Sequence, residues 1–462
     1  MKKSVIAAAL VACTAGSAFA GVIGPDVIVG SLPNLQRFSG PVGGVSGYSI
    51  ATTSCNIGDQ ILEWNPNTNI HPVISQSISR VSTAGDNGTK IQMLGISWLK
   101  HGFCALQGTV CGSCQSAGGG CPPRLGIGCS DPYSSSLNGQ QSNLGLPADV
   151  NAHTGFYQMP FTGRGQTGNN IFKRIQVNVN DLDPTQNAGA RYFGAGQYVQ
   201  SEDSDFGNQD NNASYREVTV NSGSNGGGWN LGFTGGTVRE QPVIFGWRAA
   251  DPSVTILAVN VPEIATAGDN DGLVYFAYDV SQNNDGSWHY EYAMNNVSSD
   301  NRVRGFRIPG LDIADLSNIE FDDVDYHSGS PISNTDWNTN ASTTENFEMR
   351  GASFANNPNN NSLWWGRLYR IAFDSPNPPV GTLGQLRTFK TNAFVGMPIM
   401  APQSASVCIG DCDDSGTVDF NDLVSMLFEF GNTDDGACNA DESGVVDFND
   451  LVAALFLFGP CP

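Results

Sequence analysis

The sequence predicts a mainly β protein with one or more β-sandwich-like regions, a cysteine-rich loop region and a small α-helical module at the C-terminus. Three observations lead to this fold class. Runs rich in β-branched and aromatic residues alternate with turn signals over most of the chain, as in antiparallel β-sandwiches. Before residue 400, no stretch of about 15 residues has a helical period. After residue 408, apolar residues recur at helical spacing in two related copies.

The N-terminus has the three parts of a signal peptide. Lys2 and Lys3 precede the apolar run Val5–Ala12, and Ala18-Phe19-Ala20 has the small-residue form of a cleavage site. We therefore expect residues 1–20 to be removed. The mature chain is then expected to be secreted, extracellular or at the cell surface.

An alternative reading of the same segment is a bacterial lipoprotein. Leu10–Cys13 resembles a lipoprotein processing site, which would make Cys13 the acylated first residue. In either case we expect no transmembrane segment, because no later run reaches the length of about 20 apolar residues that a membrane helix needs.

The remaining cysteines fall into two even groups, which in an exported chain indicates disulfides. The C-x-x-C motif formed by Cys111 and Cys114 could elsewhere bind zinc or carry out thiol redox chemistry, but its Gly/Ser-rich surroundings favour disulfides here. The pairing itself stays open. The two groups are Cys55, Cys104, Cys111, Cys114, Cys121 and Cys129, then Cys408, Cys412, Cys438 and Cys461.

Negative charge is concentrated at the C-terminus. The chain has 22 Lys and Arg against 44 Asp and Glu, a net charge of −22. Residues 408–462 contain twelve Asp and Glu and no Lys or Arg. This balance argues against nucleic acid and anionic membranes as partners, because both need basic patches. It favours a bound cation.

Composition divides the mature chain into a Cys-rich, Gly/Asn-rich β region (21–237), a β-sandwich, Ig-like domain (238–400), a linker (401–407) and the C-terminal module (408–462). The glycine-dense stretch 221–228 is a loop or a domain boundary. Asn283–Gly286 predicts a tight hairpin. The strands expected in the second part are Ser253–Glu263, Gly272–Ser281, Ser287–Met294, Val303–Ile308 and Leu363–Phe373.

A segment of the C-terminal module occurs twice, since Val418–Val424 recurs 28 residues later as Val446–Val452. Ahead of each copy lies a 12-position loop of the EF-hand type, in which alternate positions supply oxygen ligands and glycine at position 6 permits a sharp turn. Positions 1, 3, 5, 7, 9 and 12 are Asp411, Asp413, Ser415, Thr417, Asp419 and Asp422 in the first loop, and Asn439, Asp441, Ser443, Val445, Asp447 and Asp450 in the second.

These loops predict two Ca²⁺ sites. Calcium takes about six to eight hard oxygen ligands, and alternate positions of a curled loop bring such ligands to one point. Serine at position 5 and aspartate at position 12 depart from the usual pattern. The second loop starts with asparagine, so we expect it to bind calcium less tightly than the first. The alternative is a solvated acidic surface.

Each loop precedes a predicted amphipathic helix, and Gly431 and Gly459 stand at the expected helix ends. We expect the two helices to pack face to face over a small core, which calcium and disulfides must hold together. The apolar positions are Phe420, Leu423, Val424, Leu427 and Phe428, then Phe448, Leu451, Val452, Leu455 and Phe456.

Two loop–helix units that each lack the first helix of an EF-hand resemble the duplicated type I dockerin module (F-hand), over residues 408–462. The resemblance implies a cohesin-like partner on a scaffold or cell-surface protein, and a polysaccharide-related context. In that family, positions 10 and 11 of each loop carry recognition. Here they are Phe420-Asn421 and Phe448-Asn449, and the family's basic helix residues are missing. The four cysteines are a further departure.

The region in front of the module resembles uncharacterised exported bacterial proteins that carry such a module, which implies a shared domain and no particular activity. It contains no G-x-S-x-G in a strand–turn–helix setting, no P-loop and no dinucleotide fingerprint after a strand. The acidic clusters Glu202–Asp205 and Asp322–Asp325 are interpreted as loops or structural cation sites. Trp364 and Trp365 are interpreted as core residues.

Residues 21–400 are therefore expected to have a binding or other non-enzymatic role. One alternative is a polysaccharide-degrading enzyme of the glycoside hydrolase type, whose paired carboxylates a sequence cannot place. Another is a structural or adhesive surface protein. A metal site is not favoured in this region, because the three histidines lack ligand spacing; they are His71, His101 and His153.

Overall fold

The computed structural model describes residues 22–264, 271–403, 410–413, 415–433, 437–440 and 444–460. Within these residues the protein is mainly β, as predicted, and its sheets are antiparallel. The predicted signal peptide (1–20), Asp441 and Ser443 lie outside the described residues. In the part of the chain that is described, no helix has the length and apolar character needed to cross a membrane.

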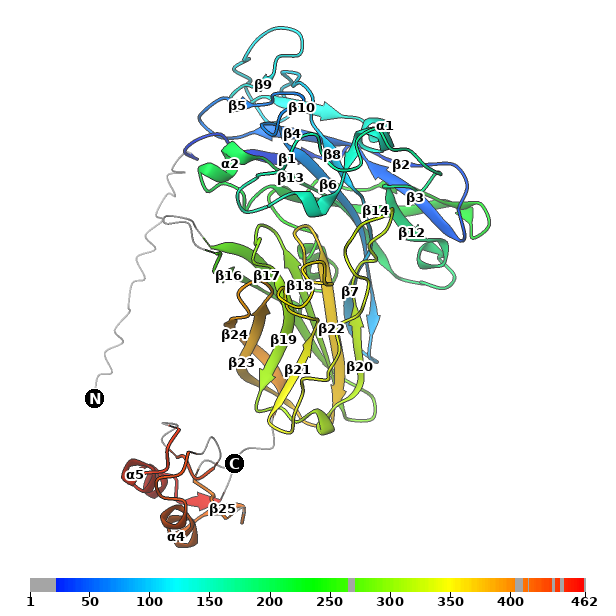
Figure 1. Cartoon of the computed structure of the whole chain (residues 1–462). Helices are drawn as coiled ribbons and strands as arrows, with labels where there is room; N and C mark the ends of the chain where they lie inside the picture. The colour runs from blue at the N-terminus through cyan, green and yellow to red at the C-terminus, as the bar shows by residue number, and fades with distance from the viewer. Residues whose placement is uncertain are drawn as a thin grey trace, which may run out of the picture.

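The N-terminal β region contains a seven-stranded sheet of order β11-β8-β6-β13-β14-β15, with β7 paired to β6 (Figure 1). Its smaller sheets have the orders β1-β4-β10, β12-β3-β2 and β5-β9. The strands are β1 (Val27–Ser31), β2 (Leu35–Arg37), β3 (Val45–Ile50), β4 (Thr52–Asn56), β5 (Leu62–Glu63), β6 (Val73–Ala84), β7 (Gly88–Ile96), β8 (Leu99–His101), β9 (Arg124–Leu125), β10 (Ser130–Tyr133), β11 (Leu144–Gly145), β12 (Ile175–Asn178), β13 (Arg191–Val199), β14 (Ala213–Ser224) and β15 (Gly228–Phe233).

Two further sheets pack against each other, as in a β-sandwich. Their orders are β16-β17-β18-β22-β20 and β21-β19-β23-β24. Aromatic rings fill the space between them: Phe306 of one sheet lies 5.3 Å from Phe276 and 5.0 Å from Tyr292 of the other, between ring centroids. The strands are β16 (Thr255–Val261), β17 (Gly272–Gln282), β18 (Trp288–Asn296), β19 (Val303–Pro309), β20 (Ser317–Asp322), β21 (Asn346–Arg350), β22 (Leu368–Ser375), β23 (Pro379–Thr388) and β24 (Phe394–Pro402).

Four of the five strands predicted in this part coincide with β16, β17, β18 and β19. The fifth, Leu363–Phe373, was placed too early, because β22 begins only at Leu368. Gly366 has a φ of 70°, a left-handed conformation that interrupts an extended run. The hairpin predicted at Asn283–Gly286 joins β17 to β18, and the Gly286 amide donates to the Asn283 carbonyl at 3.0 Å.

The hydrophobic core crosses the predicted boundary between residues 237 and 238. The hairpin formed by β6 and β7 runs out of the N-terminal region and lies beside β22 (Figure 1). Val81, Ile91 and Met93 on this hairpin therefore belong to the same buried cluster as Phe276 and Tyr292 of the sandwich. The two regions thus share this buried cluster, while a second buried cluster, which includes Val27 and Tyr198, lies within the N-terminal region alone.

The glycine-dense stretch 221–228, predicted as a loop or a domain boundary, contains the turn of the β14–β15 hairpin, in which Ser224 pairs with Gly228. The linker prediction differs from the structure. Ala401 and Pro402, which were assigned to the linker, belong to β24 and pair with strand β23. Residues 404–407 of the predicted linker lie outside the described part of the chain.

Helices in front of residue 400 are short, in agreement with the sequence. Among the described residues of that region, the longest is α3, with six residues. The helices are α1 (Ser135–Asn138), α2 (Ser201–Asp205), α3 (Phe245–Ala250), α4 (Phe420–Phe428) and α5 (Phe448–Phe456), with 3-10 turns at Gln141–Asn143, Pro147–Asp149, Val179–Leu182 and Ile313–Asp315.

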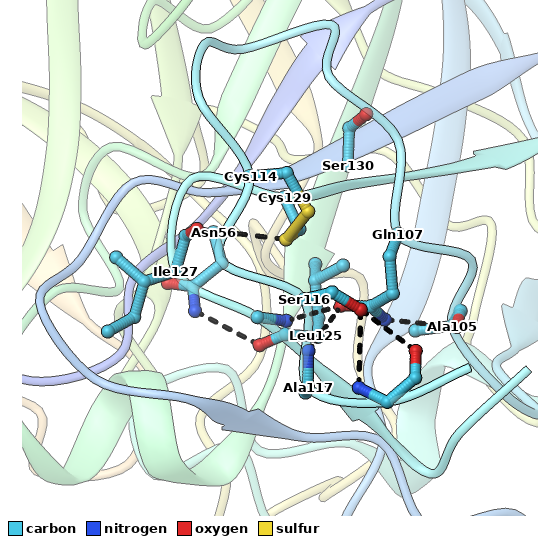
Figure 2. The surroundings of a disulfide bond; sticks show 12 residues. Asn56, Ala105, Gln107, Cys114, Ser116, Ala117, Leu125, Ile127, Cys129 and Ser130 are labelled. Carbon is cyan, nitrogen blue, oxygen red and sulfur yellow. Dashed lines mark hydrogen bonds between the residues drawn. A yellow bond between two sulfur atoms is a disulfide. The ribbon is translucent and has the colours of Figure 1, made fainter.

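All six cysteines of the N-terminal group form disulfides, which confirms that prediction. The pairs are Cys55–Cys111, Cys104–Cys121 and Cys114–Cys129. Cys111 and Cys114 thus bond to different partners, so the C-x-x-C motif is neither a redox pair nor a zinc site. Figure 2 shows Gln107 near the Cys114–Cys129 bond, where its side-chain oxygen accepts from the Ala117 amide at 3.1 Å.

A network of buried charges crosses the five-stranded sheet of the sandwich. The Arg370 guanidinium donates to Glu291 at 2.6 Å and 2.5 Å and to Glu320 at 2.7 Å, and it also pairs with Asp322. His289 Nε2 lies 2.9 Å from Glu291 and its Nδ1 lies 2.6 Å from Asp374, so the protonated imidazole donates to both carboxylates. Burial opposes the charged imidazole, but these two carboxylates outweigh burial and raise the pKa of His289.

A second buried cation holds loops of the N-terminal region together. The side chain of Lys173 is enclosed, and its Nζ donates to the carbonyl oxygens of Gln141 at 3.1 Å, Leu144 at 3.0 Å, Gly163 at 2.6 Å and Gln166 at 3.2 Å. Carbonyl dipoles here replace the water that the ammonium loses on burial.

We expect His289 to make stability depend on pH. Its folded pKa lies above the unfolded value of about 6.5, so its contribution is complete below that pH and is lost as pH rises through the folded pKa. The unfolding free energy of the protein, relative to His289→Gln, should therefore fall as the pH rises above about 6.5, as measured by urea titrations.

His71 is the matched control for this experiment. Burial lowers its pKa to about 4, so its contribution should be complete above pH 6.5 and fall as the pH drops. A difference between the protein and His289→Gln that is constant with pH would contradict the network's role.

We expect Lys173→Met to lower the unfolding free energy by about 3 kcal/mol, because it leaves several buried carbonyl groups without a donor. Lys90→Met is the control, because Lys90 makes a looser contact of 3.7 Å with the half-exposed Glu320. This substitution should lower the unfolding free energy by about 0.5 kcal/mol. Equal losses in denaturant titrations would show that Lys173 is no more than a surface charge.

Candidate metal centre

The first loop of the C-terminal module brings its acidic residues to one point. Carboxylate oxygens of Asp411, Asp413 and Asp422 lie within 4.8 Å of one another. Ligands on one calcium ion, at about 2.3–2.6 Å from the metal, are separated by distances in this range. Asp411 and Asp422 are buried, whereas Asp413 is exposed. The three residues occupy loop positions 1, 3 and 12.

Backbone amides shape this loop around Asp411. Its carboxylate accepts from the amides of Ser415 at 2.9 Å and Gly416 at 2.7 Å. Gly416 has a φ of 81°, which the sharp turn at position 6 requires and which other residues rarely adopt. The Ser415 hydroxyl donates to the Thr417 carbonyl oxygen at 3.0 Å, so the position 5 and 7 oxygens lie side by side.

Asp422 has two structural roles in addition to its place in the cluster. It accepts from the Asp413 amide at 3.1 Å, across the loop, and from the Asp419 amide at 2.6 Å. The second bond is half of a capping box, in which the Asp419 side chain caps helix α4. The helix therefore begins next to the cluster, and this closeness compensates for the short aspartate at position 12. Asp419 itself lies outside the three-carboxylate cluster.

The second loop repeats this local structure where it is described. Gly444 has a φ of 89°, and its amide donates to the Asn439 side-chain oxygen at 3.2 Å. Asp447 and Asp450 form the capping box of α5, and Asp450 is buried. Val445, at position 7 of this loop, is exposed. Positions 3 and 5 of this loop, Asp441 and Ser443, are outside the described residues.

A disulfide joins the two loops. Cys412 at loop position 2 bonds to Cys438, the residue immediately before the second loop. The short strands β25 (Thr417–Val418) and β26 (Gly459–Pro460) pair and bring the end of the chain back to the first loop. Cys408 and Cys461 lie outside the described residues. Sequence spacing left this pairing open, because either cysteine of the first copy could reach the second.

The helices are where the sequence places them, but their largest apolar side chains face solvent. The small core consists of Val418, Met426, Cys438, Val446 and Ala454, with Leu423 and Leu451 partly buried against it. Phe420, Phe428, Phe448 and Phe456 are 71%, 82%, 68% and 86% exposed. The predicted apolar stripe is therefore only partly used for packing the helices together, and each of the four phenylalanines is exposed.

The loop chemistry fits calcium on three counts. The available ligands are carboxylate, hydroxyl and carbonyl oxygens, which hard cations prefer. Two of the clustered carboxylates are buried, where an unneutralised charge is costly. Residues 408–462 contain no Lys or Arg that could neutralise them.

In the β region, the structure brings two of the three histidines together and separates the third. His71 Nε2 and His101 Nδ1 are 3.2 Å apart and share a hydrogen bond, so their lone pairs do not converge on a metal. His153 is instead near the carboxylates of Asp210 and Glu263. Trp364 and Trp365 are buried core residues, as predicted.

No protein-family model matches this chain, and no curated protein matches it either.

We expect Asp422→Asn to lower the calcium affinity of the first loop roughly tenfold or more, because affinity depends on the number of charged ligands. Isothermal titration calorimetry of the full chain checks this. Glu429→Gln is the charge-matched control, since Glu429 is exposed at the end of α4. If both variants lost affinity equally, general charge rather than coordination would be responsible.

We expect Asn439→Asp to have the opposite effect on the second loop. It adds a carboxylate at position 1 in place of an amide whose oxygen already accepts from Gly444. The weaker of two calcium-binding events should then become tighter, approaching the affinity of the first loop. Unchanged binding would show that position 1 is not what weakens this loop.

Proposed function

We propose that this chain is an exported calcium-binding protein whose dockerin-like C-terminal module tethers the β-rich region to an extracellular or cell-surface complex, in a polysaccharide-related context. The observation that carries this proposal is the convergence of Asp411, Asp413 and Asp422 in a module without basic residues. Calcium at both loops would neutralise the carboxylates and lock the start of each helix.

Export is supported by the disulfides. Three link loops of the N-terminal region and one links the calcium loops, and such bonds persist in oxidising compartments. They agree with removal of residues 1–20 as a signal peptide. Calcium is also abundant enough outside cells for extracellular modules to use sites with dissociation constants of about 10⁻⁴–10⁻³ M.

Tethering is supported by the exposed phenylalanines of α4 and α5, which we take together as one docking face. Phe428 and Phe456 occupy equivalent places at the ends of α4 and α5, and each is more than four-fifths exposed. Apolar patches of this kind mark protein interaction sites. Phe420-Asn421 and Phe448-Asn449, at the positions that dockerins use for recognition, are exposed as well. We therefore place a cohesin-like protein module on this face.

A binding or structural role for the β region is supported by its cavities. The cavity lined by Leu182, Arg191 and Glu217 measures about 310 Å³, and its one carboxylate is paired with Arg191 at 2.8 Å. The cavity beside His71, Lys100 and His101, of about 100 Å³, is lined by no carboxylate. A glycoside hydrolase needs two facing carboxylates. The alternative of an adhesive surface protein shares the same tether.

The tether is tested by retention of the full chain on a purified cohesin-like module. We expect retention in millimolar calcium, loss in EDTA, and loss in Phe428→Ser/Phe456→Ser, because that variant removes apolar contact area without touching a predicted ligand. Leu383→Ser is the control, since Leu383 is a half-exposed apolar residue on β23.

Three results would contradict the proposal: no calcium-dependent retention, retention that survives EDTA, or loss with the Leu383 control. Incubation of the same protein with soluble and insoluble polysaccharides, followed by a reducing-end assay, tests the β region. We expect no increase in reducing ends, and a clear increase would favour the glycoside hydrolase alternative.

A further inference from the structure

Two carboxylates are fully buried where the start of the described chain meets the loop after α2. Asp26 precedes strand β1, and Asp203 lies on α2; both are 0% exposed. Asp203 accepts from the Val27 amide at 2.7 Å and from the Asn212 side-chain amide at 2.7 Å. Asp26 accepts from the Asn211 side-chain amide at 3.0 Å. One compact group of side chains therefore joins residues more than 170 positions apart in sequence.

No cation compensates these charges. Neither Asp26 nor Asp203 forms an ion pair with any described residue, and the charged groups that act on them are Asp210 and Glu240, which are also acidic. Burial raises the pKa of Asp26 to about 6, although its bond from Asn211 opposes the rise. Burial also raises the pKa of Asp203 well above its usual value.

Several oxygen atoms in the same place have no donor. Asp26 Oδ1, Asn211 Oδ1 and Asn212 Oδ1 are buried and accept no hydrogen bond. In Asp26, Asn211 and Asn212, Oδ1 is the atom without a partner. The other polar atom of the same carboxylate or amide group makes a hydrogen bond to another side chain of the cluster. A buried acceptor without a partner costs about 1–3 kcal/mol, so several in one place call for a ligand.

We propose that this buried oxygen cluster (Asp26, Asp203, Asn211 and Asn212) binds a calcium ion. Carboxylate and amide oxygens make up the whole donor set, which suits a hard cation and excludes metals that prefer imidazole or thiolate. Magnesium is a poorer fit, because it keeps several of its waters, whereas Asp26, Asp203 and Asn212 are completely enclosed.

A proton is the competing occupant. One proton on Asp26 would provide one donor and satisfy one neighbouring carbonyl, but the remaining amide oxygens would still lack a partner. A divalent ion is coordinated by several oxygens at once, and it neutralises both carboxylates.

The buried oxygen cluster lies next to the first described residues, where a bound ion can hold them against the loop after α2. Asn208, in the same loop, donates to the carbonyl oxygens of Ile23 at 3.1 Å and Pro25 at 3.0 Å. At Gly24 a side chain would collide with the ring of Phe206, so the two segments approach closely. Calcium would thus stabilise the β region itself, independently of the C-terminal loops and of the tethering proposal.

The test is calcium stoichiometry of the full chain, measured by equilibrium dialysis against ⁴⁵Ca²⁺ in chelator-treated buffer. We expect three ions per chain, one ion in the loop variant Asp422→Asn/Asp450→Asn, and none when Asp26→Asn is added to that variant. Asp205→Asn, an exposed carboxylate on the same helix, should leave the single ion in place. Calcium should also raise the Tm of the loop variant, and not that of the triple variant.

A loop variant that binds no calcium would overturn the proposal, and this result does not depend on whether Asp26→Asn folds. If the loop variant binds no calcium and Asp26→Asn raises the Tm at pH 7, a proton occupies the cluster. Failure of the C-terminal loops instead would leave one ion on the unmodified chain, so the two proposals fail separately.

Discussion

A charge or polar group that leaves water on folding must gain a partner that replaces the water, and this constraint shapes several separate parts of the protein. Arg370 enters the sandwich with three carboxylates around it. Lys173 is surrounded by backbone carbonyl groups. The chain itself provides the partners of both Arg370 and Lys173, so neither buried cation needs a ligand.

Two groups of oxygen atoms differ from this pattern. The carboxylates of Asp411, Asp413 and Asp422 face one another without a basic residue, and so do Asp26 and Asp203. In both places the surrounding bonds come from backbone amides and side-chain amides, which orient the oxygens without neutralising them.

Shared packing explains why the boundaries were harder to predict than the elements. Alternation of apolar and polar residues identified β17, β18 and β19, because each strand has its own period. The same pattern does not indicate which strands share a core. Val81 and Met93 pack with the sandwich although they are far from it in sequence. The predicted division at residues 237 and 238 gives no sign of this shared packing. The two helices, by contrast, follow from local spacing and from caps contributed by Asp419 and Asp447.

The sequence by itself determined the mainly β class and the short helices of the module, because each of these depends on local spacing. It also identified the cysteines as disulfide partners. Only the tertiary structure decided the pairing of Cys412 with Cys438, the outward position of Phe428 and Phe456, and the meeting of Asp26 with Asn211 and Asn212. These depend on contacts between distant segments, which no local period records.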